Sequence, residues 1–476
     1  MTNSHPIPWT TSEILEATGG ELLCGDRQYL FAQVFIDSRR VAAGGVFVAV
    51  VGEVHDGHTF APDVVEQGGR GLVISNKNVE HLPVAKWKEK GVAVVAVEDT
   101  TRALGDMAAF NRRRSNVSVV AITGSNGKTT TRQMTAAVVS QQFNTLATVG
   151  NLNNQIGLPL TLLGLEPEHQ WAVVELGTNY PGEIARLAEI CTPDVGVITN
   201  IGPAHLEGLG SMEGVAREKG SLLKGLGRHG KAVLNADDPR VRQLARQTAH
   251  EVHLYGLAPD AAIRADDVAE KENAICFTLK LVEESISIRL NSPGRFMVTN
   301  ALAAAAVGNL LGLSAGKIKA GLEAFEPVSG RMNIHRTPNG IHIIDDTYNA
   351  NPDSMKAALT TLKRMRAGAR GIFVAGDMLE LGRQAASLHS QVGALAARSG
   401  INRLYAYGEY ADSLAAGARN EGLPAADSIT GSREEIIEDL IAWLQPGDWV
   451  LVKGSRGMAM EKVVQGLKDW AGEKKS

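Results

Sequence analysis

The sequence predicts an α/β fold divided into three domains. A chain of 476 residues is longer than one hydrophobic core usually supports. Continuous apolar runs at 117–123, 171–177 and 194–200 alternate with segments of helical pattern. Such runs are typical of parallel strands that are buried on both faces of a sheet.

The first hundred residues predict a small α/β domain. A helix is expected to start at Thr10, because Glu13 completes a capping box, and to end at Gly19-Gly20. Apolar runs then follow at 46–52, 71–75 and 92–97. We expect residues 1–114 to form this domain. The segment 109–116, which contains three consecutive arginines, is expected to be a solvated linker.

A strand, a glycine-bearing loop and a helix are predicted between residues 117 and 134. Backbone N–H groups of such a loop converge on an anion, with Lys128 as a mobile charge and Thr129 as a hydroxyl that faces a metal. The general Walker pattern has a glycine where this chain has Ile122, so only the shorter Thr-Gly-x-x-Gly-Lys-Thr form is present. The pattern predicts a site for nucleotide phosphates; the alternative is a glycine-rich turn without a ligand. The loop residues are Gly124, Ser125, Asn126, Gly127, Lys128, Thr129 and Thr130.

Polar residues follow the next two predicted strands. Glu175 ends an apolar run, and a carboxylate there can bind Mg²⁺; the alternative is a surface acid at a sheet edge. His205 lies in the Gly/Pro-rich loop after 194–200, where a metal or substrate contact competes with a structural role. Lys219 lies in a predicted helix, and the pattern alone favours a solvated lysine.

A second doubly wound α/β unit is predicted after a break at 325–335. We expect residues 115–328 to form the central domain and 329–476 the C-terminal, Rossmann-like domain. Strands are expected at 340–346, 371–377, 403–408 and 448–454, with helices that start at Asn351-Pro352 and at Ser432. Polar residues cluster at the ends of these strands and predict a binding face: Arg331, Asp345, Asp346, Asn349, Asn351, Asp377 and Lys453.

Composition excludes several functional classes. A formal net charge of −4 gives no electrostatic basis for binding nucleic acid. Cys24, Cys191 and Cys276 lack metal-binding spacing and are expected to be reduced thiols. The N-terminus has no signal-peptide pattern, and the most apolar window, 301–313, is too short to span a bilayer. We expect a cytoplasmic monomer without membrane insertion.

Six motifs, in their order and spacing, resemble the Mur ligase family: TGSNGKTT, ELGTNYPGEI, NIGPAHLEGLGS, SGRM, DDTYNANPDSM and KGSRGMAME. The resemblance covers nearly the whole chain, and the segment 36–60 is similar to the UDP-binding domain of the family. It implies a three-domain architecture with a central P-loop ATPase domain and ATP-dependent amide-bond formation through an acyl phosphate. YNANP and GDMLELG are most similar to the members that add D-alanyl-D-alanine to UDP-N-acetylmuramoyl-tripeptide, the last cytoplasmic step of peptidoglycan precursor synthesis.

The resemblance also implies roles for individual residues. Lys128 would hold the β- and γ-phosphates of ATP. Of two Mg²⁺ ions, the first would bind Thr129 and Glu175 and the second His205, while Lys219 matches a lysine that is carbamylated in the family. The other ATP contacts would be Asn300 to adenine, Arg331 to the γ-phosphate and Asp346 to the ribose.

Substrate contacts are implied in the same way. Ser38, Arg39, Asp56 and His58 match the uridine-nucleotide region, Asn151, Asn153 and Asn154 the muramoyl-peptide contacts, and Asn349 and Asn351 the dipeptide side. The chain departs from the family pattern at Tyr180, where a histidine is usual, and at Phe296-Met297. Two alternatives stay open: a sibling or folate-polyglutamate-type ligase, and a nucleotide-gated binding module in which ATP hydrolysis drives only a switch.

Overall fold

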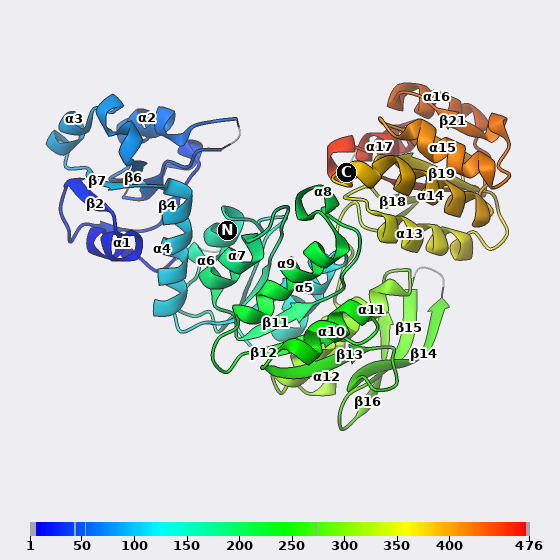
Figure 1. Cartoon of the computed structure of the whole chain (residues 1–476), viewed down its shortest axis with the longest axis horizontal. Coiled ribbons are helices and arrows are strands. Elements are labelled where there is room, and N and C mark those ends of the chain that lie inside the picture. The colour runs from blue at the N-terminus through cyan, green and yellow to red at the C-terminus, as the bar shows by residue number, and fades with distance from the viewer. Residues whose placement is uncertain (1–5, 42–43, 53, 272–273, 473–476) are drawn as a thin grey trace.

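Three α/β units, each built around its own sheet, follow one another along the chain (Figure 1). The computed structural model describes residues 6–41, 44–52, 54–271 and 274–472. Two expectations rest partly on residues outside the described ones. The expectation of no signal peptide includes residues 1–5, and the resemblance of 36–60 to the UDP-binding domain includes residues 42–43 and 53. The predicted α/β class with largely parallel sheets is confirmed. The boundaries expected after residues 114 and 328 stay predictions.

The N-terminal unit is a five-stranded sheet in the order β2-β7-β6-β5-β4, with β2 antiparallel to β7 and the other pairs parallel. Its capping box is confirmed, since Thr10 and Glu13 exchange hydrogen bonds and Gly19 closes the helix at φ 65°. Strands of this unit are β1 (Trp9–Thr10), β2 (Glu21–Cys24), β3 (Leu30–Phe31), β4 (Val34–Phe35), β5 (Val46–Val48), β6 (Gly71–Ser75) and β7 (Ala93–Val97). Its helices are α1 (Thr11–Thr18), α2 (Ala61–Glu66) and α3 (Val84–Glu89), with 3₁₀ turns η1 (Ser38–Arg40), η2 (Gly57–Phe60) and η3 (Asn76–His81).

The segment expected to be a solvated linker is instead the end of a long helix, α4 (Thr100–Arg114). Arg112 pairs with Asp194 at 2.9 Å, and Arg114 pairs with Glu13 at 2.8 Å. The Arg114 guanidinium also lies 4.2 Å from the centre of the Trp9 ring. The expectation is wrong because two of the three arginines have partners distant in sequence. Helix α4 packs on α1, α6 and α7 and joins the first two units.

The central unit is a nine-stranded sheet in the order β16-β15-β14-β13-β12-β11-β8-β10-β9. Strands β8 to β14 pair with one another in parallel. Strands β15 and β16 extend the sheet through the antiparallel pairs β14-β15 and β15-β16, which the sequence reading did not predict. The strands are β8 (Ser118–Thr123), β9 (Thr145–Ala147), β10 (Trp171–Glu175), β11 (Val195–Ile198), β12 (Lys231–Asn235), β13 (Glu251–Gly256), β14 (Ile263–Lys271), β15 (Ala274–Lys280) and β16 (Ser285–Leu290).

Helices cover both faces of the parallel part of this sheet, as its continuous apolar runs predicted. Along β8, Val119 and Ala121 join one core with α6, α7 and α9, while Val120 and Ile122 join the other with α5, α11 and α12. The central helices are α5 (Lys128–Val139), α6 (Gly157–Leu163), α7 (Glu183–Cys191), α8 (Leu206–Leu209), α9 (Met212–Lys224), α10 (Pro239–Gln247), α11 (Phe296–Leu310) and α12 (Ala315–Glu323).

The apolar window at 301–313 is explained by burial within the protein. Most of it belongs to α11, whose residues 300–308 are all buried. Among the described residues, no helix has the length and apolar character needed to cross a membrane. All three cysteines are free thiols, as expected.

The C-terminal unit is a six-stranded sheet in the order β17-β18-β22-β19-β20-β21, parallel except for β17. The predicted helix starts are confirmed, with Asn351 and Ser432 as capping-box residues. Its strands are β17 (Asn333–Arg336), β18 (His342–Asp346), β19 (Gly371–Gly376), β20 (Arg403–Tyr407), β21 (Ser428–Thr430) and β22 (Trp449–Lys453). Its helices are α13 (Pro352–Met365), α14 (Ala385–Arg398), α15 (Ala411–Asn420), α16 (Arg433–Trp443) and α17 (Glu461–Trp470), with turns η4 (Gly382–Gln384), η5 (Ala425–Asp427) and η6 (Arg456–Met458).

Replacing Arg114 is expected to destabilise the packing of α4 against α1 and β1. Arg114→Gln removes the ion pair with Glu13 and the contact with the Trp9 ring, and we expect the free energy of unfolding to fall by about 1–3 kcal/mol. Urea denaturation measures this. The neighbouring Arg113 is exposed, so Arg113→Gln is the matched control and should change stability by less than about 0.5 kcal/mol. Equal effects of the two substitutions would contradict the assigned role of Arg114.

Candidate active site

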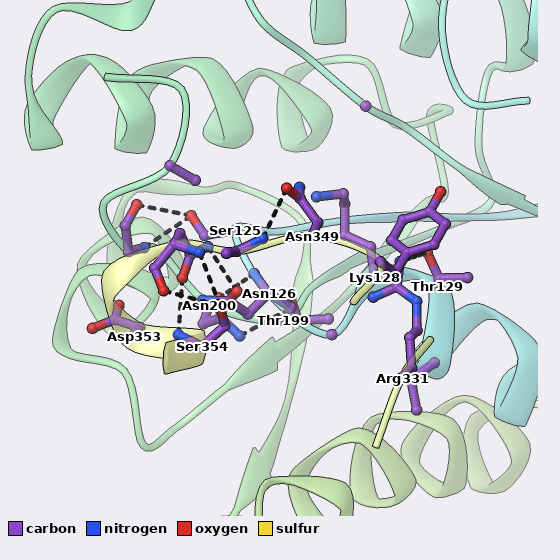
Figure 2. Close-up of a pocket in the computed structure, with 18 of the residues that line it drawn as sticks. Ser125, Asn126, Lys128, Thr129, Thr199, Asn200, Arg331, Asn349, Asp353 and Ser354 are labelled. Atoms are coloured by element: carbon purple, nitrogen blue, oxygen red, sulfur yellow. Dashed lines mark hydrogen bonds between the residues drawn. The ribbon is translucent and has the colours of Figure 1, made fainter. Parts of the chain in front are cut away.

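A cavity of about 660 Å³ lies where the central and C-terminal units meet. Its central-unit walls are the loops that follow β8, β10, β11 and β12, and its other walls are the loops that follow β18, β19 and β22. In both sheets these loops leave the carboxyl ends of parallel strands, which is where α/β proteins gather ligands. Figure 2 shows the part of this cavity around the phosphate-type loop.

The loop between β8 and α5 is held in shape by the strand beside it. The backbone N–H of Ser125 donates to the Asn200 carbonyl at 3.0 Å, and the N–H of Asn126 donates to the Asn200 side chain at 2.8 Å. The Thr199 hydroxyl and the Asn200 amide both donate to the Asn126 carbonyl. The Lys128 ammonium folds back to donate to the Gly124 carbonyl at 2.8 Å, and burial lowers its pKa. Hydrogen bonds within the protein therefore hold the loop in this shape.

The backbone of Gly127, at the start of α5, packs directly against the Asn300 side chain. Gly127 has a φ of 79°, and a Cβ there would lie only 2.3 Å from the Asn300 side-chain oxygen. That oxygen also accepts a hydrogen bond from Thr131 at 3.3 Å. Phe296 and Phe325 line the cavity nearby. This wall is mostly apolar, with Asn300 as its amide, and suits a flat heterocycle such as adenine.

One oxygen of the Glu175 carboxylate is buried without a hydrogen-bond partner in the described part of the chain. The other oxygen accepts from the Asn153 amide at 2.8 Å, and the nearest cation is Arg132, with Nε 3.7 Å from Oε2. The Thr129 hydroxyl lines the same cavity and accepts from Arg331 at 3.0 Å. An unpartnered buried carboxylate oxygen and a hydroxyl beside a phosphate-type loop fit Mg²⁺, which binds through one or two carboxylates plus substrate phosphates. No group of three or more His, Cys, Asp or Glu side chains that could hold a metal occurs among the described residues.

His205 connects the two units. Its backbone is left-handed, at φ 55°, and its Nδ1 lies 2.5 Å from the Glu380 carboxylate. Burial lowers the pKa of His205, while the Glu380 carboxylate acts in the opposite direction. His205 therefore stands at the cavity in contact with the C-terminal unit.

Lys219 is almost completely buried in α9, with 1% of its surface exposed. Burial, followed by the charge of Lys128, holds the pKa of Lys219 well below its usual value. The neighbouring Glu218 accepts hydrogen bonds from the backbone N–H groups of Gly182 and Ile184, at the start of α7. A solvated helix lysine is therefore excluded, because the side chain is buried and burial disfavours its charged form.

The predicted residues of the C-terminal unit reach the cavity by different routes. The Arg331 guanidinium stacks 4.0 Å from the centre of the Tyr348 ring and lies over the start of α5 (Figure 2). The Asp346 carboxylate pairs with Lys453 at 2.6 Å, although burial raises its pKa. Asn351 uses its oxygen to cap α13 and its amide to donate to the Asn126 side chain at 2.8 Å. Its side chain thus links the two units.

The uridine-side residues lie in the N-terminal unit, away from this cavity, and Lys219 is not among the lining residues. His58 is buried, and both ring nitrogens contact the protein itself: Nδ1 lies 2.5 Å from Asp56, and Nε2 accepts from the Ser75 N–H at 2.8 Å. Arg39 is exposed and pairs with Asp37, which lowers the pKa of that carboxyl to about 2. His58 therefore orders the η2 turn around Asp56. Ser38 lies in the neighbouring turn η1.

Sequence reasoning missed three charged residues at the cavity or beside it. Glu380 and Arg456 belong to segments that the sequence singles out, GDMLELG and KGSRGMAME, yet in the first segment Asp377 was the carboxylate assigned to the binding face, with an ordinary cap as its alternative role. The Asp377 carboxylate instead accepts backbone N–H bonds from Glu409 and Tyr410, which is a structural role. Arg132, beside Glu175, could not be recognised as a site residue from the sequence, because it lies within the helical pattern of α5 and belongs to none of the six motifs.

A phosphate-binding loop covered by a second α/β unit defines a nucleotide-dependent enzyme of two facing units. Residues 122–308 match the Mur ligase middle domain, 330–456 the Mur ligase glutamate ligase domain, and 31–112 the catalytic domain of the Mur ligase family. The chain belongs to the Mur ligase family, which are ATP-dependent ligases.

Similar proteins cover nearly all of the chain. The UDP-N-acetylmuramoyl-tripeptide–D-alanyl-D-alanine ligase of Escherichia coli strain K12 is 38% identical over 97% of this chain and 99% of its own length. A crystal structure of MurF from Acinetobacter baumannii has 32% identity and a TM-score of 0.88, over 98% of this chain and 99% of that one. The MurF ligase of Thermotoga maritima, solved in complex with ADP, has 26% identity and a TM-score of 0.81, over 92% and 97% of the two chains.

A methyl group at Gly127 is expected to impair nucleotide binding. Gly127→Ala forces a strained φ and drives Cβ into the Asn300 side chain, so we expect the affinity for ADP to fall by at least about tenfold, measured by calorimetry. Gly312→Ala is the control, because Gly312 has φ 74° but open space around its Cβ. Wild-type ADP affinity in the Gly127 variant would show that this contact does not shape the site.

Proposed function

We propose that this chain joins D-alanyl-D-alanine to the terminal carboxylate of UDP-N-acetylmuramoyl-tripeptide, with conversion of ATP to ADP and phosphate. The observation that carries the proposal is the cavity between the two units, where a preformed phosphate loop faces loops of a second sheet. The E. coli relative, which matches along nearly its whole length, bears the name of this activity and supports the same conclusion.

The proposed reaction has two steps. A carboxylate oxygen of the tripeptide attacks the γ-phosphorus of ATP, and the bond to the bridging oxygen breaks to give an acyl phosphate and ADP. The amine of the dipeptide then attacks the acyl carbon, and the tetrahedral intermediate loses phosphate, with release of the amine proton, to leave the amide. Enclosure between two units would protect the acyl phosphate from hydrolysis, because water is kept away until the dipeptide amine attacks.

Positive side chains would stabilise the transferring phosphoryl group. Lys128 and Arg331 lie on opposite sides of the start of α5, one from each unit, so both can contact a phosphate bound there. Asn300 would contact the adenine, and Asp346, beside Lys453, the ribose. The remaining loop contacts would come from backbone groups of residues 124–130.

We propose two Mg²⁺ ions, the first held by Thr129 and Glu175 and the second through His205, and these ions would neutralise charge on the phosphates. Lys219 would carry a carbamate. Its burial and lowered pKa support this, because only a neutral amine adds CO₂. The carbamate would replace the Lys219 amine by an anion that acts on His205.

The three units would divide the remaining work. Residues 1–114 would hold the uridine nucleotide through Ser38, Arg39 and Asp56, with His58 ordering the turn. Residues 115–328 would bind ATP and hold the muramoyl peptide beside Asn151, Asn153 and Asn154, which line the cavity. Residues 329–476 would bind the dipeptide near Asn349 and Asn351 and close over ATP. We propose a monomer that works in the cytoplasm, where ATP is available.

Phosphate release with and without each substrate tests the proposed function. A ligase should release phosphate only when ATP, UDP-N-acetylmuramoyl-tripeptide and D-alanyl-D-alanine are all present. A nucleotide-gated switch would hydrolyse ATP without the dipeptide, and a sibling ligase would accept a free amino acid in its place. Parallel reactions with diaminopimelate- and lysine-containing tripeptides identify the third residue of the peptide.

Loss of the loop lysine is expected to slow turnover. Lys128→Ala removes a charge that stabilises the phosphoryl group, and we expect kcat to fall about 10²-fold, equivalent to about 3 kcal/mol. The coupled phosphate-release assay measures it, with the exposed Lys224→Ala as control. Turnover near that of the wild type would refute the phosphate-loop assignment.

The carbamate is tested separately. Lys219→Ala should reduce kcat by at least about 10²-fold, and a small added carboxylate such as formate should restore part of the activity, because it can replace the lost anion. Retained ADP binding would show that the variant is folded. Full activity without any addition, or loss of activity without rescue in a folded variant, would count against a carbamate.

A further inference from the structure

We propose that Arg456 and Glu380 form the two charged ends of the subsite for the dipeptide, with Arg456 binding its carboxylate and Glu380 its ammonium group. The inference rests on the proposed function and specifies which residues of the C-terminal unit select a zwitterionic acceptor. Both residues line the cavity, from the loops that follow β22 and β19.

Arg456 is the cation at this cavity that can bind the dipeptide carboxylate, because the other cations that line it are already engaged. In the described part of the chain, the lysines and arginines that line it are Lys128, Arg331, Lys453 and Arg456. Lys128 belongs to the phosphate loop, and Arg331 bonds to Thr129 at its edge. Lys453 is buried and bound to Asp346 and to the Asn349 carbonyl. The Arg456 side chain is 68% exposed, and its only ion pair among the described residues is a loose one of 3.5 Å with Glu461.

Glu380 is the corresponding anion. Glu183 and Asp238 accept backbone N–H bonds, and Asp346 pairs with Lys453, so these acids are already engaged. Asp353 lies at the other end of the phosphate loop from Lys128 (Figure 2). The Glu380 side chain is 46% exposed and has one oxygen bound to His205, at 2.5 Å. Its second oxygen makes no hydrogen bond to any described residue.

The two loops are fixed to each other, which sets the relative position of the two charges. The N–H of Leu379 donates to the Ser455 hydroxyl at 2.9 Å, and the Ser455 N–H donates to the Asp377 carbonyl at 2.9 Å. Leu379 is 42% exposed, and its Cδ1 approaches Gly457. Charged groups on neighbouring loops with an exposed leucine between them match a dipeptide that has two charged ends and small methyl side chains.

The position of Glu380 also orients the dipeptide. Glu380 contacts His205 and interacts electrostatically with Lys128, so it marks the end of the subsite nearest the phosphoryl group. The amine must reach the acyl phosphate, whereas the carboxylate takes no part in the reaction. An ammonium end at Glu380 and a carboxylate end at Arg456 place on the reactive side the nitrogen that becomes the nucleophile once it has lost a proton. The side chains of Asn349 and Asn351 already have partners in the protein: the Asn349 oxygen accepts the N–H of Ala350, and the Asn351 amide donates to Asn126. They would therefore border this subsite, and the charged ends of the dipeptide would bind Glu380 and Arg456.

Kinetics with an acid and an amide substrate test the carboxylate contact. The measurements are kcat/KM of the full-length protein for D-alanyl-D-alanine and for D-alanyl-D-alaninamide, at saturating ATP and UDP-tripeptide. The wild type should prefer the acid by about 10- to 100-fold, the range of a hydrogen bond between charged groups. Arg456→Gln should lower kcat/KM for the acid by a similar factor and bring the acid-to-amide ratio near one, while the KM values for ATP and the UDP-tripeptide change less than twofold. Arg456→Lys should keep part of the preference.

The control is Arg398→Gln, because Arg398 is another exposed arginine of the C-terminal unit, paired with Glu421 and remote from the cavity lining. It should leave the ratio unchanged. If the wild type uses the dipeptide but Arg456→Gln keeps the full preference for the acid, the assignment of Arg456 is overturned and the proposed function stands. If the wild type shows no dipeptide-dependent phosphate release, the proposed function fails, and this inference fails with it.

The ammonium contact has its own measurement. Glu380→Gln should raise the KM for D-alanyl-D-alanine about tenfold or more and leave the acid-to-amide ratio at its wild-type value, because the carboxylate end is intact. Calorimetry with ADP should give wild-type affinity, which separates this effect from damage to the nucleotide site. An unchanged KM for the dipeptide would overturn the role of Glu380.

Discussion

The arrangement of the site depends on how the loop at 124–127 is held from two sides. The segment that follows β11 supplies Thr199 and Asn200, which bind the backbone of the loop. The C-terminal unit supplies Asn351, which binds the side chain of Asn126. A loop fixed by its own sheet needs little reorganisation to accept an anion, and the contact from the other unit ties the position of α13 to that same loop.

Much of this arrangement follows from local sequence. The strand-loop-helix pattern at 117–134 predicted β8, the loop and α5 correctly, because apolar continuity, glycine and helix-start residues agree there. The capping boxes at Thr10 and Ser432 and the cap at Asn351 were also correct, since a cap depends on residues three positions apart. Glu175 and His205 line the cavity because each follows the carboxyl end of a parallel strand, and those ends lie at one edge of the sheet.

Other features depend on partners that are distant in sequence, and local patterns do not reveal them. The run of arginines at 112–114 looked solvated, but Asp194 and Glu13, which bind it, lie on other elements. The antiparallel strands β15 and β16 extend a parallel sheet, and their sequence does not show which edge they join. Lys219 is buried by tertiary packing of α9, although its local pattern suits an exposed helix. The opposite charges of Glu380 and Arg456 reach the same cavity only when the loops after β19 and β22 fold side by side.

Helix α4 connects the N-terminal sheet to the central unit. Fifteen residues of α-helix are about 22 Å long, and the ion pair of Arg112 with Asp194 fixes the end that precedes β8 to the central unit. Rotation of such a helix by roughly 10° about its fixed end would move the far end by about 4 Å. A substrate bound at the N-terminal sheet would move with this helix toward or away from the cavity, so its position depends on how firmly the ion pair of Arg112 with Asp194 holds one end of α4.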